Sequence, residues 1–169
     1  MTKMERLVVI GCPGSGKSWL SRELGRVTKL PVFHLDMMYW NEDKTTVGAD
    51  EFLARLDAAL AGQRWIIDGN YMSTMHKRVE RCDTVIFLDY PTEVCLLGVA
   101  ERRGRVRDDM PWVEDEPDEE FLAFIKAFST DTRPKILSLL SEYEGKREIH
   151  IFTDRASSME FLKKISKST

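Results

Sequence analysis

The sequence predicts an α/β fold in which helices cover both faces of a parallel sheet. Short apolar runs of strand length alternate with longer segments of helical period, the pattern expected when helices connect parallel strands. A glycine-rich turn at residues 11–18 also lies directly between the first apolar run and the first helical segment. A chain of 169 residues suits one domain with a sizeable core, so we expect a single domain over residues 1–169.

Five strands are expected from the apolar runs, and seven helices from the segments between and after them. The strands are predicted at residues 5–10, 31–34, 64–67, 84–88 and 148–152. The helices are predicted at about residues 17–27, 50–61, 73–80, 91–103, 118–128, 131–143 and 157–165.

Local signals support individual helices. Asp50 is a favourable N-cap, and the residues after it place an apolar stripe on one helix face, formed by Phe52, Leu53, Leu56 and Leu60. Pro91 suits the start of the helix that runs to about Arg103. Residues 104–117 are polar and rich in turn-forming residues, so we expect them to form an exposed, mobile segment.

The composition excludes several classes of protein. The chain has 25 basic and 28 acidic residues, a net charge of −3 and a pI near 5.7, whereas nucleic-acid binding proteins usually carry excess positive charge. Its three cysteines form no CxxC pair and no zinc pattern, so reduced thiols are expected. The N-terminus lacks the apolar core of a signal peptide and no apolar stretch reaches 18 residues, which predicts a cytoplasmic protein without a membrane partner.

Residues 11–18, with the sequence GCPGSGKS, match the phosphate-binding pattern GxxxxGK[ST] in its expected strand–turn–helix context. Glycines let successive backbone N–H groups point at one anion, and the N-terminus of the following helix adds partial positive charge. Lys17 is predicted to reach the β- and γ-phosphates of ATP, and the Ser18 hydroxyl to bind Mg²⁺. The predicted nucleotide-binding residues are Gly11, Cys12, Pro13, Gly14, Ser15, Gly16, Lys17, Ser18 and Trp19. For Trp19, packing of the helix is the favoured role and stacking on adenine the alternative.

Three acidic residues follow predicted strands, at the edge where functional side chains gather in such folds. Asp68 follows an apolar strand and is predicted to hold Mg²⁺ through water, with capping of the next turn as the alternative. Asp89 is more readily explained as an N-cap near Pro91. Asp36 follows the second strand and is a candidate catalytic residue, whereas His34 just before it is expected to pack at the strand end.

Several segments together resemble one protein family. They are the phosphate loop, His34-Leu35-Asp36, Ile66-Ile67-Asp68-Gly69-Asn70-Tyr71, Ile86-Phe87-Leu88-Asp89, Arg102-Arg103 and Thr132-Arg133-Pro134-Lys135-Ile136-Leu137. In this order they resemble the adenylate-kinase-related group named after DNA topology modulation proteins. The resemblance implies a P-loop NTPase fold like that of nucleoside monophosphate kinases, with a five-stranded parallel sheet in the order 2-3-1-4-5. It also implies an acceptor-binding segment at about residues 35–62 and a lid-like, arginine-bearing segment at about residues 102–118.

The chain departs from adenylate kinases at one informative place. Their Asp-Gly-Phe-Pro-Arg segment, whose arginine grips the acceptor phosphate, corresponds here to Asp68-Gly69-Asn70-Tyr71-Met72. A phosphate acceptor therefore requires another cation, for which Arg78 and Arg81 on the next helix are the candidates.

These features predict an ATP- and Mg²⁺-dependent kinase that acts on a small molecule, such as a nucleoside, a nucleotide or another hydroxylated metabolite. Lid arginines are expected to stabilise the transferring phosphoryl group, foremost Arg103 and Arg107, with Arg102, Arg105 and Arg133 as alternates. Asp36 is expected to orient or deprotonate a hydroxyl acceptor, or to anchor a base or ribose if the acceptor is a phosphate. The sequence does not decide between a hydroxyl acceptor and a phosphate acceptor.

Two further questions also stay open from the sequence. The aromatic and methionine residues at 37–40 either pack beneath the acceptor segment or form a flat wall for a substrate ring. The alternative function is that of an ATP-binding regulatory protein that affects DNA topology, although nucleic acid is an unlikely partner at this charge. A monomer or a weak dimer is expected.

Overall fold

The structure is a computed structural model that describes residues 3–116 and 118–169. All the strand pairs of its five-stranded sheet are parallel, and the strand order is β2-β3-β1-β4-β5. The predicted fold class and strand order are therefore confirmed. The strands are β1 (Arg6–Gly11), β2 (Val32–His34), β3 (Trp65–Asp68), β4 (Thr84–Leu88) and β5 (Glu148–Phe152).

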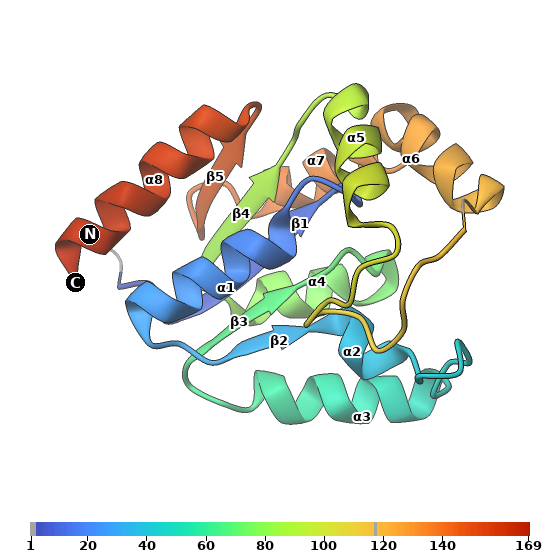
Figure 1. Ribbon diagram of the computed structural model, residues 1–169. Helices are drawn as coiled ribbons and strands as arrows, with labels where there is room; N and C mark the ends of the chain where they lie inside the picture. Colours follow the sequence, from blue (N-terminus) through green and yellow to red (C-terminus); the bar gives the residue numbers. More distant parts are fainter. Residues whose placement is uncertain (1–2, 117) are drawn as a thin grey trace.

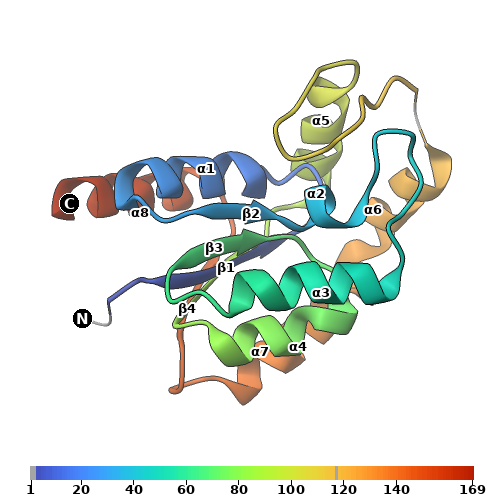
Figure 2. The same ribbon diagram turned by 90° about the horizontal axis from the view of Figure 1, so that it is seen from below.

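Helices cover both faces of the sheet, as Figure 2 shows: α1 and α8 lie on one side, and α3, α4 and α7 on the other. Two further helices, α5 and α6, stand beyond the carboxyl ends of the central strands (Figure 1). The helices are α1 (Lys17–Thr28), α2 (Leu35–Tyr39), α3 (Ala49–Leu60), α4 (Met72–Arg81), α5 (Thr92–Arg102), α6 (Glu119–Asp131), α7 (Arg133–Glu142) and α8 (Arg155–Ser168).

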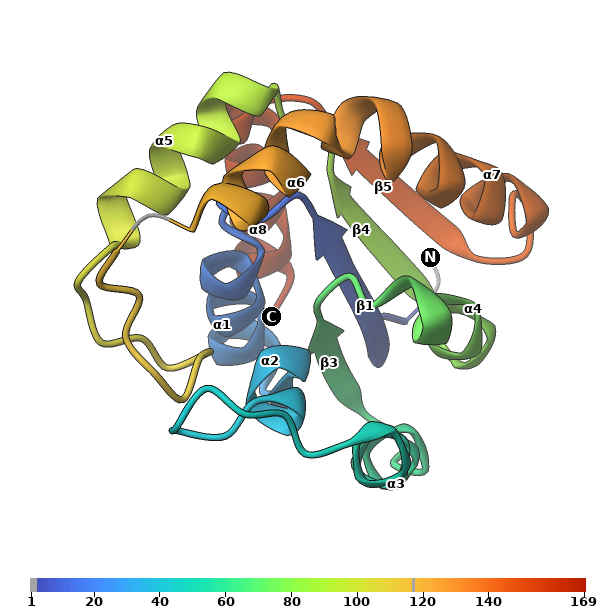
Figure 3. The same cartoon turned by 90° about the vertical axis from the view of Figure 1, so that its right-hand side faces the viewer.

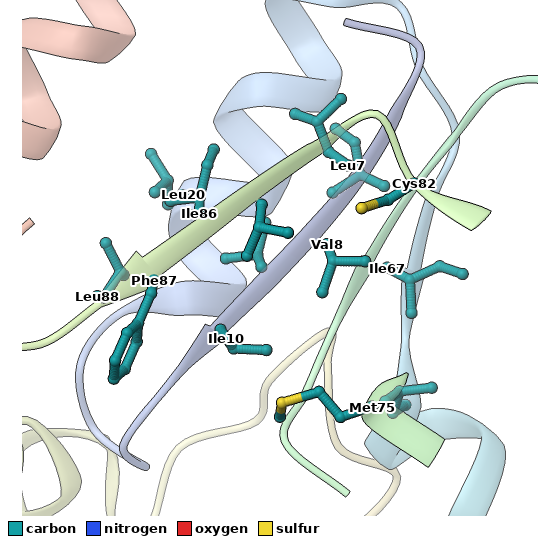
Figure 4. Packing of buried hydrophobic residues seen from close by; sticks show 14 of the residues in the cluster. Leu7, Val8, Ile10, Leu20, Ile67, Met75, Cys82, Ile86, Phe87 and Leu88 are labelled. Carbon is teal, nitrogen blue, oxygen red and sulfur yellow. The ribbon is translucent and has the colours of Figure 1, made fainter. Parts of the chain in front are cut away.

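The core is built around the three central strands. Every residue of β3 and β4 is buried, and so are the residues of β1 after Arg6, as expected for parallel strands covered on both faces. Their side chains gather with Leu20 of α1 and Met75 of α4 in one cluster (Figure 4). The edge strands β2 and β5 contain no fully buried residue.

The register of the strands brings three important segments to one edge of the sheet. His34 at the end of β2 is paired with Asp68 at the end of β3, and Asp68 is also paired with Val9 of β1. Gly11, where the phosphate loop begins, is paired with Leu88 at the end of β4. Residues that are far apart in the sequence therefore meet where the carboxyl ends of the strands lie together.

The structure corrects two local predictions. The five-residue helix α2 follows β2 directly and was not predicted, because so short a segment contains little more than one helical turn. The predicted N-cap at Asp50 is wrong, since α3 begins at Ala49 with Gly48 as its N-cap. Asp50 instead lies in the first turn, where its negative charge complements the helix dipole. Among the described residues, no helix has the length and apolar character needed to cross a membrane.

Candidate active site

Residues 11–18 form an open cup between β1 and α1. Gly14 and Gly16 adopt φ angles of 86° and 92°, a region that favours glycine. The Ser15 N–H donates to the Cys12 carbonyl at 3.0 Å, which closes the turn before α1 begins at Lys17. A Cβ atom added at Gly16 would meet no heavy atom within 4 Å. The loop therefore has free space at Gly16, whereas residues 11–15 are buried, and its glycine backbone and the helix N-terminus fit a polyphosphate.

Helix α5 packs closely against the back of this loop through two glycines. A Cβ atom at Gly14 would lie 2.0 Å from the Cys95 carbonyl oxygen, and one at Gly98 would lie 2.1 Å from the Gly14 carbonyl oxygen. Neither position leaves room for a side chain. The thiol of Cys12 is buried in this region, where a hydrogen bond with Cys95 and burial raise its pKa, so Cys12 contributes its backbone rather than a reactive thiolate.

The front of the loop is fixed by Asn70, which follows β3. Its Oδ1 accepts a hydrogen bond from the Gly11 N–H at 3.1 Å, and its Nδ2 donates to the Gly11 carbonyl at 2.7 Å. One side-chain amide thus satisfies both backbone polar groups of the residue that opens the phosphate loop.

The two strand-end groups next to the loop form a buried pair. The His34 Nδ1 lies 2.6 Å from the Asp68 Oδ2, and Asp68 is only 3% exposed. Burial acts to lower the pKa of His34, but the hydrogen bond and negative charge of Asp68 outweigh it and raise the pKa above its ordinary value. His34 therefore holds the Asp68 carboxylate in one orientation, a role beyond the packing expected from the sequence.

Asp36, on α2, forms the second carboxylate of the site. The Tyr71 hydroxyl donates to its Oδ1 at 2.5 Å. Burial raises the pKa of Asp36, although the Tyr71 hydrogen bond and the charge of Lys17 act against this rise. A carboxyl group with a raised pKa and a fixed orientation is suited to accept a proton from a bound hydroxyl.

Lys17 and Asp36 both line one large cavity, of about 690 Å³. Aromatic side chains form much of its wall, and the segment between α5 and α6 forms another part of it. In Figure 3 this segment runs beside the loop that follows α2. The aromatic lining residues are Tyr39, Trp40, Tyr71, Trp112, Phe121 and Phe124. Ser18 and Asp68 are not among the residues that line this cavity; Ser18 is bonded to Asp109, and Asp68 to His34.

The lid-like segment is exposed at residues 104–106 and 108, as predicted, but it folds over the site at Asp109. Asp109 is only 6% exposed and accepts a hydrogen bond from the Ser18 hydroxyl at 2.8 Å. Burial acts to raise the pKa of Asp109, but the charge of Arg107 and the Ser18 hydrogen bond lower it overall. The segment thus contacts the residue predicted to bind magnesium, and the sequence contains no local signal for this contact.

The lid arginines differ in their surroundings. Arg107 pairs with Glu114 at 3.0 Å and Arg102 pairs with the same carboxylate at 3.4 Å. Arg103 lines the cavity, whereas Arg105 is exposed and does not. Of the four, Arg102 and Arg103 therefore line the cavity, and Arg107 reaches it through Glu114 and Asp109.

Two residues proposed from the sequence have other partners in the structure. The Arg133 Nε donates to Asp89 at 2.9 Å, so this arginine is tied to the end of β4 and does not line the cavity. Asp89 is consequently not the cap of α5, whose N-cap is Pro91 without a side-chain hydrogen bond. Trp19 is 45% exposed on α1 and is absent from the cavity wall.

Neither arginine on α4 is available to an acceptor phosphate. Arg78 is fully buried and donates to the carbonyls of Gly69, Asn70 and Tyr71, with distances of 3.0 Å to Gly69 and 3.2 Å to Tyr71. Arg81 donates to the Leu60 carbonyl at 3.0 Å on the far side of α4. The substitution considered from the sequence is therefore wrong for both residues.

The fold is the one found in several solved kinases. The chain is similar to the shikimate kinase from Bacteroides thetaiotaomicron, with a TM-score of 0.63, 18% identity and 98% of each chain covered. A shikimate kinase from Acinetobacter baumannii, solved with shikimate, gives a TM-score of 0.64 at 14% identity, with 98% of this chain and 93% of that chain covered.

A gluconokinase from Sinorhizobium meliloti 1021 gives a TM-score of 0.56 at 16% identity, with 96% of this chain and 90% of that chain covered. No family model matches the chain, and no curated protein matches it. At these identities the likeness establishes a shared fold.

Proposed function

We propose that the protein is an ATP-dependent kinase that transfers a phosphoryl group to a hydroxyl of a small molecule. The observation that carries this proposal is the placement of Lys17 and Asp36 on the wall of one cavity at the mouth of the phosphate loop. The shared fold of the shikimate kinases and the gluconokinase supports it. We also propose that the chain is a member of the DNA topology modulation family, because its sequence segments resemble that family.

The chain offers a complete set of groups for ATP and magnesium. The backbone N–H groups of residues 11–18 and the Lys17 ammonium would hold the phosphates, and Ser18 and Asp68 would hold Mg²⁺. Bound magnesium would neutralise the negative charge that develops on the leaving group. Trp19 stays a candidate for a contact with the base, reached from the outer side of α1.

A hydroxyl acceptor fits the site better than a phosphate. Asp36 lies in the cavity with its pKa raised by burial, so it can take up the proton of the attacking hydroxyl. The hydroxyl oxygen forms the new bond to the γ-phosphorus, the bond from this phosphorus to the bridging oxygen breaks, and ADP leaves with the electron pair. Arg103, which lines the cavity, stabilises the charge of the transferring group, and Arg107 joins it when its ion pairs with Asp109 and Glu114 open. Residues 35–62 then serve as the acceptor-binding segment and residues 102–118 as the lid.

A screen for ADP release tests the proposal. Nucleosides, nucleoside monophosphates and small hydroxylated metabolites are offered with Mg·ATP, and Lys17→Ala serves as the blank. The wild type is expected to release ADP only with a hydroxyl acceptor, and Asp36→Asn is expected to abolish this turnover while Mg·ATP still binds. Equal ADP release by the wild type and Lys17→Ala would count against the proposed site.

The regulatory alternative depends on the arginines near residues 102–107 being available to DNA. Two of them, Arg102 and Arg107, are instead neutralised by Glu114. A DNA-binding protein shows an affinity that falls steeply with salt concentration. We expect no measurable binding of duplex DNA at low salt, and a steep salt dependence would favour the alternative.

A further inference from the structure

We propose that the acceptor is a hydroxyl compound with a flat ring and no negative charge, the chemical class that includes nucleosides. This inference rests on the proposed kinase function. It goes further by specifying the shape and the charge that the acceptor end of the cavity selects, and it excludes anionic hydroxyl compounds. Three features of the cavity carry it.

The first feature is an aromatic wall at the acceptor end. The rings of Tyr39 and Trp40 meet edge to face with centroids 5.3 Å apart, and Trp40 meets Trp112 in the same way at 5.7 Å. Trp112 belongs to the lid segment, so the wall joins residues that lie on both sides of the cavity mouth. Side chains of this kind offer a flat ring a large contact area at little cost in conformational entropy.

The aromatic residues near Asp36 also have fixed positions. Tyr71 packs against Tyr39 with centroids 5.1 Å apart, and Phe52 of α3 supports both rings from behind, at 5.5 Å from Tyr39 and 5.1 Å from Tyr71. The hydroxyl of Tyr71 is bound to Asp36. A ring seated on this wall therefore stands beside the proposed base, as required for a substrate that presents both a ring and a hydroxyl.

The second feature is that two arginines near the aromatic wall are engaged by other groups, while Arg103, which also lines the cavity, is assigned above to the transferring phosphoryl group. Arg78 is enclosed by the backbone carbonyls of the segment after β3. Arg102 is paired with Glu114. Lys44 also lines the cavity, and its ammonium lies over the Trp112 ring at 5.1 Å from its centre. A planar anion beside the aromatic wall would thus compete with Glu114 for Arg102 and with the transferring phosphoryl group for Arg103.

The third feature is a local excess of negative charge. Six acidic residues line the cavity against four basic ones: Asp36, Asp109, Glu114, Asp115, Glu116 and Asp118 against Lys17, Lys44, Arg102 and Arg103. Asp115 and Glu116 form no ion pair within the part of the chain that the structure describes. An excess of carboxylates around a cavity disfavours the binding of an anion. A neutral or cationic ring compound avoids this penalty, whereas an anionic one incurs it.

A calorimetric titration measures the charge preference directly. The full chain is saturated with Mg·ADP to fill the nucleotide site and is then titrated with nucleosides, with the matching nucleoside 5′-monophosphates, and with shikimate and gluconate. We expect at least one nucleoside to bind about tenfold or more tightly than its monophosphate, and shikimate and gluconate not to bind. Tighter binding of a monophosphate or of either hydroxy acid overturns the inference, and so does the absence of binding by all nucleosides.

Two variants distinguish the effect of the aromatic wall on acceptor binding from the effect of the negative charge around it. Trp112→Leu is expected to weaken nucleoside binding about tenfold, since stacking on an aromatic side chain contributes roughly 1–3 kcal/mol per base. The double variant Asp115→Asn, Glu116→Gln is expected to reduce the difference in affinity between a nucleoside and its monophosphate. The control is Phe161→Leu, which removes an aromatic ring from the cluster between β5 and α8 and should change neither affinity. Unchanged affinities in both site variants contradict the proposal.

The proposed kinase function is tested separately from the proposed class of acceptor. Failure of the wild type to bind Mg·ATP removes the proposed function itself. Binding of Mg·ATP together with rapid phosphorylation of an anionic, ring-free acceptor leaves the kinase intact and rejects only the acceptor class inferred here.

Discussion

Asn70 holds Gly11 by both of its backbone polar groups, and this contact joins the end of β3 to the beginning of the phosphate loop. The neighbouring Tyr71 holds Asp36 at the acceptor end of the same cavity. Two consecutive residues therefore fix the positions of the nucleotide loop and of the proposed base. The distance between the two reacting partners depends on the conformation of this short segment.

Removing the Asn70 amide should weaken nucleotide binding. Asn70→Ala loses two hydrogen bonds that order the loop, each of which typically contributes about 1 kcal/mol. We expect the dissociation constant of Mg·ATP to rise about tenfold or more. Titration of Mg·ATP measures this change, and Gln63→Ala, which removes an exposed amide from the turn before β3, serves as the control. An Mg·ATP affinity equal to that of the wild type would show that the loop holds its shape without this bridge.

Arg78 should be essential for stability rather than for acceptor binding. Its guanidinium is the donor for the carbonyls of the segment that carries Asn70 and Tyr71. Arg78→Leu removes the donor of the Gly69 and Asn70 carbonyls, whereas the Tyr71 carbonyl keeps its hydrogen bonds from Thr74, and each unsatisfied buried group costs about 1–3 kcal/mol. We expect the free energy of unfolding to fall by about 3 kcal/mol or more, measured by urea denaturation.

The matched control is Arg81→Leu, on the same helix and exposed to solvent. It loses one hydrogen bond, to the Leu60 carbonyl, and is expected to cost about 1 kcal/mol or less. Similar losses for the two variants would contradict the special role of the buried guanidinium.

Gly98→Ala should destabilise the protein although it improves helix propensity. In the interior of an ordinary helix this change is favourable by about 1 kcal/mol. Here the new Cβ atom would lie 2.1 Å from the Gly14 carbonyl oxygen, so α5 must move away from the phosphate loop. We expect a lower melting temperature and weaker Mg·ATP binding. Ala100→Gly on the exposed side of α5 gives the effect of propensity alone, and a Gly98→Ala protein more stable than the wild type would contradict the close contact.

The sequence predicts the fold well because its signals are local. The apolar runs, the glycine pattern of the phosphate loop and the acids after the strands are each contained in a few residues. The resemblance to adenylate-kinase-related proteins added the strand order, which the structure confirms. Helix α2 was missed because five residues are too few to show a helical period.

The contacts that complete the site escape sequence reasoning because they join distant residues. The hydrogen bond between Ser18 and Asp109 spans 91 positions, and the contacts between Gly11 and Asn70 span 59. Arg78 illustrates a second reason. A charged residue on a short helix is expected to be exposed to solvent. In the structure, the segment after β3 instead surrounds its guanidinium with three backbone carbonyls. The sequence Asp68-Gly69-Asn70-Tyr71 is distinctive, but it does not reveal the contacts of this segment with Gly11, Asp36 and Arg78.

Tyr71 should set the pH dependence of the proposed reaction. Asp36 must be ionised to accept a proton, so activity falls as the pH drops below its pKa. Burial raises this pKa, and the hydrogen bond from the Tyr71 hydroxyl lowers it by stabilising the carboxylate. Tyr71→Phe removes the stabilising bond, so the pKa of Asp36 rises further. We expect the acidic limb of the kcat/KM profile to move upward by about one pH unit.

The control for this shift is Tyr39→Phe, which removes a neighbouring hydroxyl while keeping the ring that packs against Tyr71. Its acidic limb should match that of the wild type, because no hydrogen bond joins the Tyr39 hydroxyl to Asp36, whose side chain is bound by Tyr71. A role of Tyr71 limited to packing predicts the same profile for Tyr71→Phe and the wild type, since the phenyl ring is retained. An acidic limb that moves to lower pH in Tyr71→Phe would mean that the hydroxyl stabilises the protonated form of Asp36, which is incompatible with its action as the base.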